Sequence, residues 1–195
     1  MEKVAHDLSE RERVEMLVTR SRAAMRTFAD ADQARVDETV TALAWAIYKP
    51  EHARELAGLA VRETGMGNVV DKTTKNQRKT FGALRDLMRA KTVGVIEELP
   101  DLGLVKYAKP VGVVAAVTPS TNPSATAVNK SMMAVKGKNA IIVAPSPGGL
   151  ETCTRTVELL REGLETIGEP VDLIQVLPGP ATKSLTAILM ESCDL

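Results

Sequence analysis

The amino-acid sequence predicts an α/β protein in which helices pack on a parallel sheet and a short β-ribbon projects from the body. Three observations carry this prediction. Apolar residues recur at helical spacing through the first ninety positions, two β-branched runs flank a short turn, and three apolar runs then alternate with helical segments. The chain has 195 residues, 44% of them hydrophobic and 26% charged, which is enough to bury a sizeable core.

The first ninety residues carry the start and stop signals of four helices. Ser9–Glu12 has the S-x-x-E capping-box pattern ahead of the first apolar stripe. A second stripe, Val36–Ile47, ends before Pro50, which suits the first turn of a third helix that Gly65 stops. A fourth helix is expected from about residue 71 to residue 89. We expect these helices to form one layer whose apolar faces are buried against a later part of the chain.

Two extended runs follow the helices. Thr92–Leu99 and Gly103–Ala108 are rich in β-branched residues and are joined by a Pro-Asp-Leu turn. This arrangement predicts a hairpin or ribbon. A two-stranded ribbon alone is at best marginally stable in water, so it is expected to need a partner.

The second half of the chain has the alternation expected of a parallel sheet. Val111–Val117 is a nearly continuous apolar run, typical of a strand buried on both faces. Ala140–Ala144 and Leu173–Leu177 repeat this type, and helical stretches near residues 124–135 and 150–167 separate the three runs. The order strand, helix, strand, helix, strand indicates right-handed βαβ crossovers in a Rossmann-like sheet.

A last helix, at about residues 181–191, leads into what looks like the approach to a fourth strand. Natural domains avoid the long exposed edge that a sheet cut at this point would leave. We therefore expect a truncated sheet and a longer parent protein. The chain divides into residues 1–91 as the helical part, residues 92–109 as the ribbon and residues 110–195 as an incomplete α/β dinucleotide-binding portion.

Charge and cysteine content exclude several classes of function. The 25 Lys and Arg residues balance 25 Asp and Glu residues, so no net field draws the chain to nucleic acid or to an anionic membrane. The two cysteines and two histidines lack metal-ligand spacing, which predicts no metal site. No apolar run reaches membrane-spanning length, and the first residues lack the apolar core of a signal peptide. We expect a cytoplasmic protein with free thiols.

The loop after the first parallel strand is the strongest candidate for chemistry. The segment Thr118-Pro119-Ser120-Thr121-Asn122-Pro123 lies at the carboxyl end of that strand, where open α/β sheets bind ligands. Two prolines stiffen the loop, and the Asn122 amide could donate hydrogen bonds to an oxygen that develops negative charge. On residue type alone, a turn in which Asn122 satisfies its own backbone is the simpler interpretation.

Several motifs in fixed order carry a resemblance to a known family. They are Lys109-Pro110-Val111-Gly112-Val113-Val114, Thr118-Pro119, Asn122-Pro123, Lys130, Gly137 and Asn139. Over these residues the chain resembles the cofactor-binding half of the aldehyde dehydrogenase superfamily. A second set, Glu63-Thr64-Gly65-Met66-Gly67, Asp71-Lys72 and Lys75-Asn76, looks like the coenzyme A-acylating branch of that superfamily. The resemblance extends from about residue 10 to residue 195.

The resemblance implies roles for individual positions. Asn122 matches the asparagine whose side-chain amide helps to form the family's oxyanion hole. Cofactor contacts are implied in three loops, at Thr118, Pro119 and Ser120, at Ala144, Pro145, Ser146 and Pro147, and at Gly179 and Pro180. Many non-acylating members have a lysine and a glutamate at the positions of Ala144 and Pro147. The charged clamp on the cofactor ribose is therefore missing, and both NAD and NADP stay open.

For the complete enzyme, the resemblance implies attack of a cysteine thiolate on a small-molecule aldehyde. Hydride transfer to NAD or NADP and transfer of the acyl group to coenzyme A then follow. Neither Cys153 nor Cys193 matches the family's nucleophile, whose position lies beyond Leu195, and both are interpreted as buried or incidental thiols. The ribbon resembles the family's subunit-bridging arm, which implies a homodimer or homotetramer.

Other interpretations stay open from the sequence. Non-acylating dehydrogenases and glutamyl-phosphate reductases are similar in this half, and a stand-alone nucleotide-binding module is a third alternative. The basic stretch on the fourth helix is interpreted as a solvated face, with coenzyme A phosphates as the alternative; it comprises Lys72, Lys75, Arg78 and Lys79. His52 is interpreted as a solvated residue rather than a base. Gly148-Gly149, before a helix, fits either a plain loop or an anion site.

Overall fold

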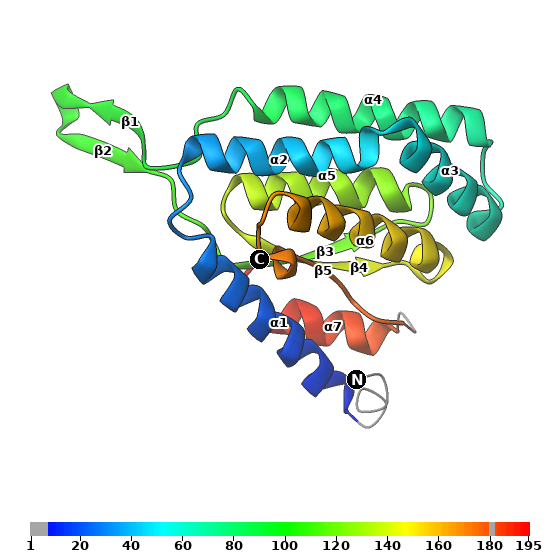
Figure 1. The fold of residues 1–195 in the computed structure, drawn as a ribbon. Coiled ribbons are helices and arrows are strands. Elements are labelled where there is room, and N and C mark those ends of the chain that lie inside the picture. Colours follow the sequence, from blue (N-terminus) through cyan, green and yellow to red (C-terminus); the bar gives the residue numbers. More distant parts are fainter. Residues whose placement is uncertain (1–7, 180–181) are drawn as a thin grey trace.

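The computed structural model describes residues 8–179 and 182–195 (Figure 1). The helices are α1 (Glu10–Thr27), α2 (Gln33–Tyr48), α3 (Pro50–Thr64), α4 (Val69–Leu87), α5 (Pro123–Lys136), α6 (Leu150–Thr166) and α7 (Lys183–Ser192). The strands are β1 (Val95–Leu99), β2 (Leu104–Tyr107), β3 (Val113–Thr118), β4 (Ala140–Pro145) and β5 (Ile174–Val176). In the described ranges no helix combines the length and apolar character needed to cross a bilayer.

The expected start of α1 and both expected ends of α3 are confirmed by their capping residues. The Ser9 hydroxyl accepts a hydrogen bond from the Glu12 backbone N–H, and the Glu12 carboxylate accepts one from the Ser9 N–H at 2.8 Å. This reciprocal pair satisfies two donors that a helix start leaves free. Pro50 occupies the first turn of α3, and Gly65 ends that helix with φ of 66°, a left-handed conformation that glycine adopts at little cost.

Strands β3, β4 and β5 form a parallel sheet in the order β3-β4-β5. The expectation that the first of these strands is buried on both faces is wrong in part. The strand begins at Val113 rather than at Val111, which precedes it and is 58% exposed. The central strand β4 is buried at every residue, whereas Val117 of β3 is 50% exposed. The difference in burial follows from the place of each strand in the three-stranded sheet, because β3 is an edge strand and β4 has a strand on each side.

The last two residues run along the free edge of β3. The Asp194 N–H donates to the Val113 carbonyl at 2.9 Å, and the Ala115 N–H donates to the Leu195 carbonyl at 2.7 Å. In a β-strand, the backbone N–H and C=O groups of successive residues point alternately to the two edges of the strand. In β3 the groups of the even-numbered residues point toward β4, so those of Val113 and Ala115 point to the opposite edge. The chain therefore crosses from β5 back to the other side of β3.

The helices lie on both faces of the sheet. Helices α5 and α6 cover one face, with α2, α3 and α4 outside them, and α1 and α7 cover the other (Figure 1). The four N-terminal helices thus do not form the single layer that their sequence suggested. Val14 and Val18 of α1 belong to a cluster with Val113, Ile142 and Leu185, which holds α1 on the α7 side.

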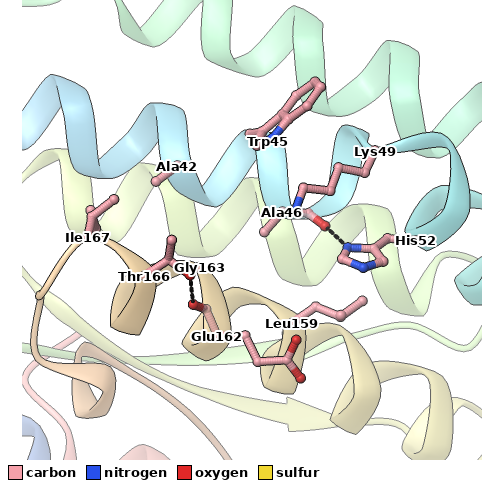
Figure 2. Close-up of a pocket in the computed structure, with 10 residues that line it drawn as sticks. All are labelled: Ala42, Trp45, Ala46, Lys49, His52, Leu159, Glu162, Gly163, Thr166 and Ile167. Carbon is pink, nitrogen blue, oxygen red and sulfur yellow. Dashed lines mark hydrogen bonds between the residues drawn. The ribbon is translucent and has the colours of Figure 1, made fainter.

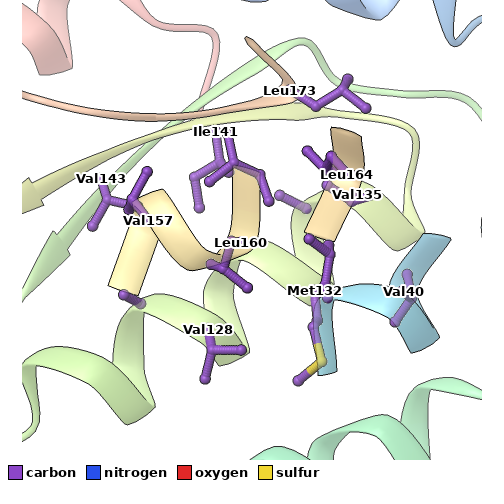
Figure 3. Packing of buried hydrophobic residues seen from close by; sticks show 14 of the residues in the cluster. Val40, Val128, Met132, Val135, Ile141, Val143, Val157, Leu160, Leu164 and Leu173 are labelled. Atoms are coloured by element: carbon purple, nitrogen blue, oxygen red, sulfur yellow. The ribbon is translucent and has the colours of Figure 1, made fainter. Parts of the chain in front are cut away.

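The main core lies between the sheet and the α2, α5 and α6 helices. Figure 3 shows Ile141 and Val143 of β4 packed against Val157 and Leu160 of α6. Met132 of α5 is fully buried in the same cluster. Burying such a side chain contributes about 1.5–3 kcal/mol, so this packing fixes where α5 begins relative to the sheet.

The ribbon formed by β1 and β2 stands away from the rest of the chain (Figure 1). Its strands pair antiparallel, and Gly103 completes the turn with φ of 63°. At the base of the ribbon, the Gln33 amide oxygen accepts the backbone N–H groups of Thr92 and Val93 at 2.8 and 3.2 Å. The Gln33 amide nitrogen in turn donates to Asp37, so the root of the ribbon is fixed to α2 while its strands are exposed.

Candidate functional site

Three loops that leave the carboxyl ends of β3, β4 and β5 meet at one edge of the sheet. The crossover from β5 to the far side of β3 makes the end of β3 the point where the strand order reverses. In open α/β sheets this reversal opens a crevice that binds ligands. The segment predicted from the sequence, residues 118–123, occupies this position.

Close contacts hold these loops together. The Ser146 N–H donates to the Thr118 carbonyl at 3.1 Å. A Cβ added to Gly149 would lie 3.0 Å from the Pro123 Cβ, so the glycine permits the approach of the first two loops. A Cβ added to Gly179 would lie 2.7 Å from Leu150 Cδ2, which brings the third loop onto the start of α6. Pro180 lies outside the described residues.

The predicted cofactor residues differ in how much surface they offer. Thr118 is buried, and its hydroxyl faces the Ala144 carbonyl oxygen at 3.5 Å and Cys153 Sγ at 3.7 Å. Pro119 and Pro147 are exposed and Ser120 is partly exposed. The Ser146 hydroxyl is buried without a hydrogen-bond partner among the described residues. Ala144 and Pro145 are buried in β4, so their side chains contribute walls rather than polar contacts.

Asn122 immediately precedes α5 but does not cap it through its side chain. Its backbone is extended, with φ of −145°, and its carbonyl accepts the Thr126 N–H at 3.2 Å. No hydrogen bond from its carboxamide to residues 8–179 or 182–195 is found. The interpretation that Asn122 satisfies its own backbone in a turn is therefore not what the structure shows. A half-buried amide with free donors lies at the end of β3.

The Asn122 side chain lines a hollow of about 240 Å³ between α4 and α5. The other lining residues are Lys75, Lys79, Ala125, Thr126, Asn129 and Lys130. Within the described ranges no carboxylate lies within ion-pair distance of the three lysines. Nearby, Lys72 Nζ lies 3.4 Å from the Thr121 carbonyl, and burial, followed by the Lys75 charge, lowers the Lys72 pKa. The site is strongly cationic.

The start of α6 is capped by a carboxylate of this chain. Glu63 accepts the backbone N–H groups of Glu151 and Thr152 at 2.8 and 2.9 Å, and the Thr152 hydroxyl at 2.7 Å. A helix N-terminus attracts anions, and here Glu63 supplies one. Glu63 thus occupies the amides at the start of α6 that could hold an external anion. This favours the interpretation of Gly148-Gly149 as a plain loop over that of an anion site.

A second hollow lies between α2, α3 and α6, away from the predicted loops (Figure 2). His52 lines it, and a ring nitrogen of His52 lies 2.6 Å from the Ala46 carbonyl oxygen. Figure 2 shows this bond, and none of the residues predicted for cofactor or substrate lines the pocket. His52 is thus held by the backbone rather than freely solvated, and it does not line the hollow that contains Asn122.

Lys130 lies across from the basic stretch of α4, a relationship that was not predicted from the sequence. Its signal was helical spacing, because Asn122, Thr126 and Lys130 are four residues apart and so follow one face of α5. Lys75 and Lys79 have the same spacing on α4. The contact between α4 and α5 brings the two faces together, which the sequence alone does not reveal.

Comparison with known proteins gives a consistent result. A family model described as the aldehyde dehydrogenase family matches residues 3–193. Sulfoacetaldehyde dehydrogenase (acylating) of Cupriavidus necator is 51% identical over 184 residues, which are 94% of this chain and 37% of that protein. Succinate-semialdehyde dehydrogenase (acetylating) of Clostridium kluyveri is 38% identical over 182 residues, 93% of this chain and 40% of that protein.

Solved structures agree with the sequence relatives. An acetylating aldehyde dehydrogenase from Geobacillus thermoglucosidasius superposes with a TM-score of 0.87 at 34% identity, covering 93% of this chain and 39% of that one. A probable aldehyde dehydrogenase from Listeria monocytogenes has the same TM-score at 31% identity. The chain thus spans less than half the length of the relatives it matches. By sequence and fold, it belongs to the aldehyde dehydrogenase family.

Proposed function

We propose that the protein of which this chain is part oxidises an aldehyde to an acyl-coenzyme A thioester, with NAD or NADP as oxidant. The overall reaction balances as aldehyde plus coenzyme A thiol plus oxidised nicotinamide giving acyl-coenzyme A, reduced nicotinamide and one proton. A cysteine thiolate, which matches no position of this chain, would add to the carbonyl first. The acylating and acetylating names of the relatives support this reaction over the non-acylating and reductase alternatives.

The observation that carries the proposal is the Asn122 carboxamide at the end of β3, which forms no hydrogen bond with another described residue. When a thiolate attacks an aldehyde, the carbonyl oxygen becomes an oxyanion that needs hydrogen-bond donors. A preorganised amide supplies such a donor without reorganisation. Because α5 begins at the next residue, the position of Asn122 is set by the packing of that helix.

The loops at this edge fit a nicotinamide dinucleotide. Gly149 and Gly179 let the three loops pack closely, and Pro119 and Pro147 are exposed at this edge. Within the described residues the buried Ser146 hydroxyl has no hydrogen-bond partner, so it is available to a ligand. We assign the remaining cofactor contacts to Thr118, Ser120, Ala144, Pro145 and Pro180. The dinucleotide, when bound, accepts the hydride. The protein's part is to orient the aldehyde against it and to exclude water.

The first test is kinetic and uses the full-length enzyme. Replacing Asn122 by alanine is expected to lower kcat about 10²–10³-fold, because one oxyanion donor is lost. The KM for the dinucleotide should change little. Reduced nicotinamide is followed by absorbance with and without coenzyme A. Sustained turnover without coenzyme A, leading to a free acid, would contradict the acylating reaction.

Two of the relatives are named for aldehydes that carry an acid group, sulfoacetaldehyde and succinate semialdehyde. We include both compounds in the aldehyde panel, beside neutral aldehydes of similar length. A stand-alone binding module would bind the dinucleotide but oxidise none of them.

We further propose that residues 92–109 are an assembly arm of a cytoplasmic homo-oligomer. Exposed apolar side chains on the ribbon, Leu104, Val105 and Tyr107, support a partner surface, and both cysteines are free thiols. A Val105→Lys, Tyr107→Lys variant of the full-length protein should sediment as a smaller species than the wild type. A wild type that is monomeric at micromolar concentration would exclude the arm.

A further inference from the structure

We propose that Lys75, Lys79 and Lys130 bind an anionic group at the far end of the aldehyde whose carbonyl faces Asn122. The substrate would then be a short aldehyde with a sulfonate or carboxylate tail. This inference rests on the proposed function, because it assigns Asn122 to the reacting carbonyl. It adds the residues that select the substrate class.

The first support is placement. Lys75 and Lys79 are one turn apart on α4, and Lys130 lies two turns after Asn122 on α5. All of them line the same hollow. Long side chains on a helix point back toward its N-terminus, so Lys130 extends toward Asn122 rather than away from it. The carboxamide and three ammonium groups therefore belong to one site.

The second support is charge. Three cations line one hollow, and within the described ranges no carboxylate pairs with any of them. Other basic side chains of the chain do find acids, as Arg155 does with Glu55 and Lys106 with Glu97. Unpaired like charges repel one another, and an anion in the hollow relieves that repulsion. The neighbouring Lys72 adds a fourth positive charge.

The third support is size. The hollow holds about 240 Å³, which is below the range of about 300–1,000 Å³ typical of sites for drug-sized ligands. The rise from Asn122 to Lys130 along α5 is about 12 Å, and the lysine side chain shortens the remaining gap. A short aldehyde with a charged end spans it. Its small volume favours the aldehyde over coenzyme A as the molecule that these lysines bind.

The kinetic test compares two aldehydes in the full-length enzyme, sulfoacetaldehyde as the anionic probe and propionaldehyde as the neutral one. Lys130→Gln and Lys75→Gln should each lower kcat/KM for sulfoacetaldehyde about 10–100-fold, as expected for loss of a charge-assisted hydrogen bond. Propionaldehyde kinetics and the KM for coenzyme A should change less than about twofold. Lys130→Arg should keep most of the preference for sulfoacetaldehyde over propionaldehyde. Arg78 lies outside the hollow, so Arg78→Gln serves as the matched control.

A binding experiment separates this inference from the proposed function. Ethanesulfonate, which cannot react, is titrated calorimetrically into the wild type and the Lys130→Gln variant. Binding that weakens at least about tenfold in the variant supports the subsite even if no aldehyde is turned over. Equal binding, absence of wild-type binding, or a selective rise in the KM for coenzyme A overturns it. Equal losses with both aldehydes would also overturn it.

Discussion

The Ser124 hydroxyl donates a hydrogen bond to the Asn76 amide oxygen at 2.8 Å, which ties the second residue of α5 to the middle of α4. The Asn76 amide nitrogen donates to the Ala53 carbonyl oxygen of α3 at 3.2 Å. Asn76 is only 4% exposed, so water does not compete for either bond. One buried amide thus joins three helices two residues away from Asn122.

Replacing Asn76 by leucine should destabilise the protein by about 1–3 kcal/mol. The Ala53 carbonyl and the Ser124 hydroxyl would both be left buried without this partner. The free energy of unfolding, measured by urea denaturation, checks the size of the effect. Gln77→Ala is the control, because the bond from Gln77 to the Tyr48 carbonyl is exposed, and it should cost less than about 0.5 kcal/mol. Similar losses in both variants would show that Asn76 is not a special junction.

Gly112→Ala should be strongly destabilising. Gly112 has φ of 140°, and an added Cβ would lie 2.1 Å from the Asp194 carboxylate oxygen. The strained conformation alone costs about 1–3 kcal/mol, and the clash would force Asp194 off β3. Gly82→Ala in α4 is the matched control, since nothing lies within 4 Å of its added Cβ and the helix should gain about 0.5–1 kcal/mol. Thermal unfolding should show a lower midpoint for Gly112→Ala and a higher midpoint for Gly82→Ala than for the wild type. An unchanged midpoint for Gly112→Ala would contradict the predicted destabilisation.

Gly112 also shows how far the sequence could lead. The motif around Gly112 and Asn139 was visible in the sequence, and it indicated the family. The physical role of these residues was not visible. The Asn139 side chain accepts the backbone N–H groups of Val111 and Gly112 at 2.7 and 3.0 Å, and these residues lie 27 or more positions earlier in the sequence. Local periodicity predicts an element, whereas such contacts depend on the complete topology.

The same limit explains what was missed at the site. Helical spacing predicted the first helix correctly. An amphipathic stripe does not say which face of a sheet it covers, so the sequence did not separate α1 from the other three N-terminal helices. Glu63 was visible only as part of a motif, and its partners at the start of α6 lie almost ninety residues later. The place of Asn122 between the end of a strand and the start of a helix, by contrast, was predictable, because these elements are adjacent in the chain.

Cys153 and Cys193 should both be unreactive in the native protein. Burial raises the pKa of the Cys153 thiol to about 12, although the Thr118 hydroxyl partly offsets this. Burial, followed by the Asp194 charge, raises the pKa of Cys193 to about 11. Only the thiolate reacts, and at pH 8 it is at most about one part in a thousand of either cysteine. Brief iodoacetamide treatment and peptide mass mapping should therefore find label at these positions only after unfolding in urea. Rapid native labelling of Cys153 would contradict its assignment as a structural thiol.

The segment that lies along β3 should loosen as the pH falls. Arg22 lies 2.9 Å from the Asp194 carboxylate, and the Val113 N–H donates to that carboxylate at 2.8 Å. The Arg22 bond, followed by the Val113 bond, lowers the pKa of Asp194 in the folded protein. The unfolded value is about 3.9, so this stabilisation is fully present above that pH and disappears as the pH drops through the lower folded value.

Asp194→Asn removes the titrating group and tests this linkage directly. The variant should be less stable than the wild type at pH 7. The difference in urea midpoint should shrink as the pH falls below about 4 and the wild-type carboxylate is protonated. Asp101→Asn in the exposed turn of the ribbon controls for the change in net charge. If the difference in urea midpoint between the two proteins stays constant down to pH 2, Asp194 holds the end of the chain through contacts that do not depend on its charge. High salt should narrow the gap only slightly at pH 7, because the bond to Val113 is a direct contact with a backbone N–H and is less open to screening than a distant ion pair.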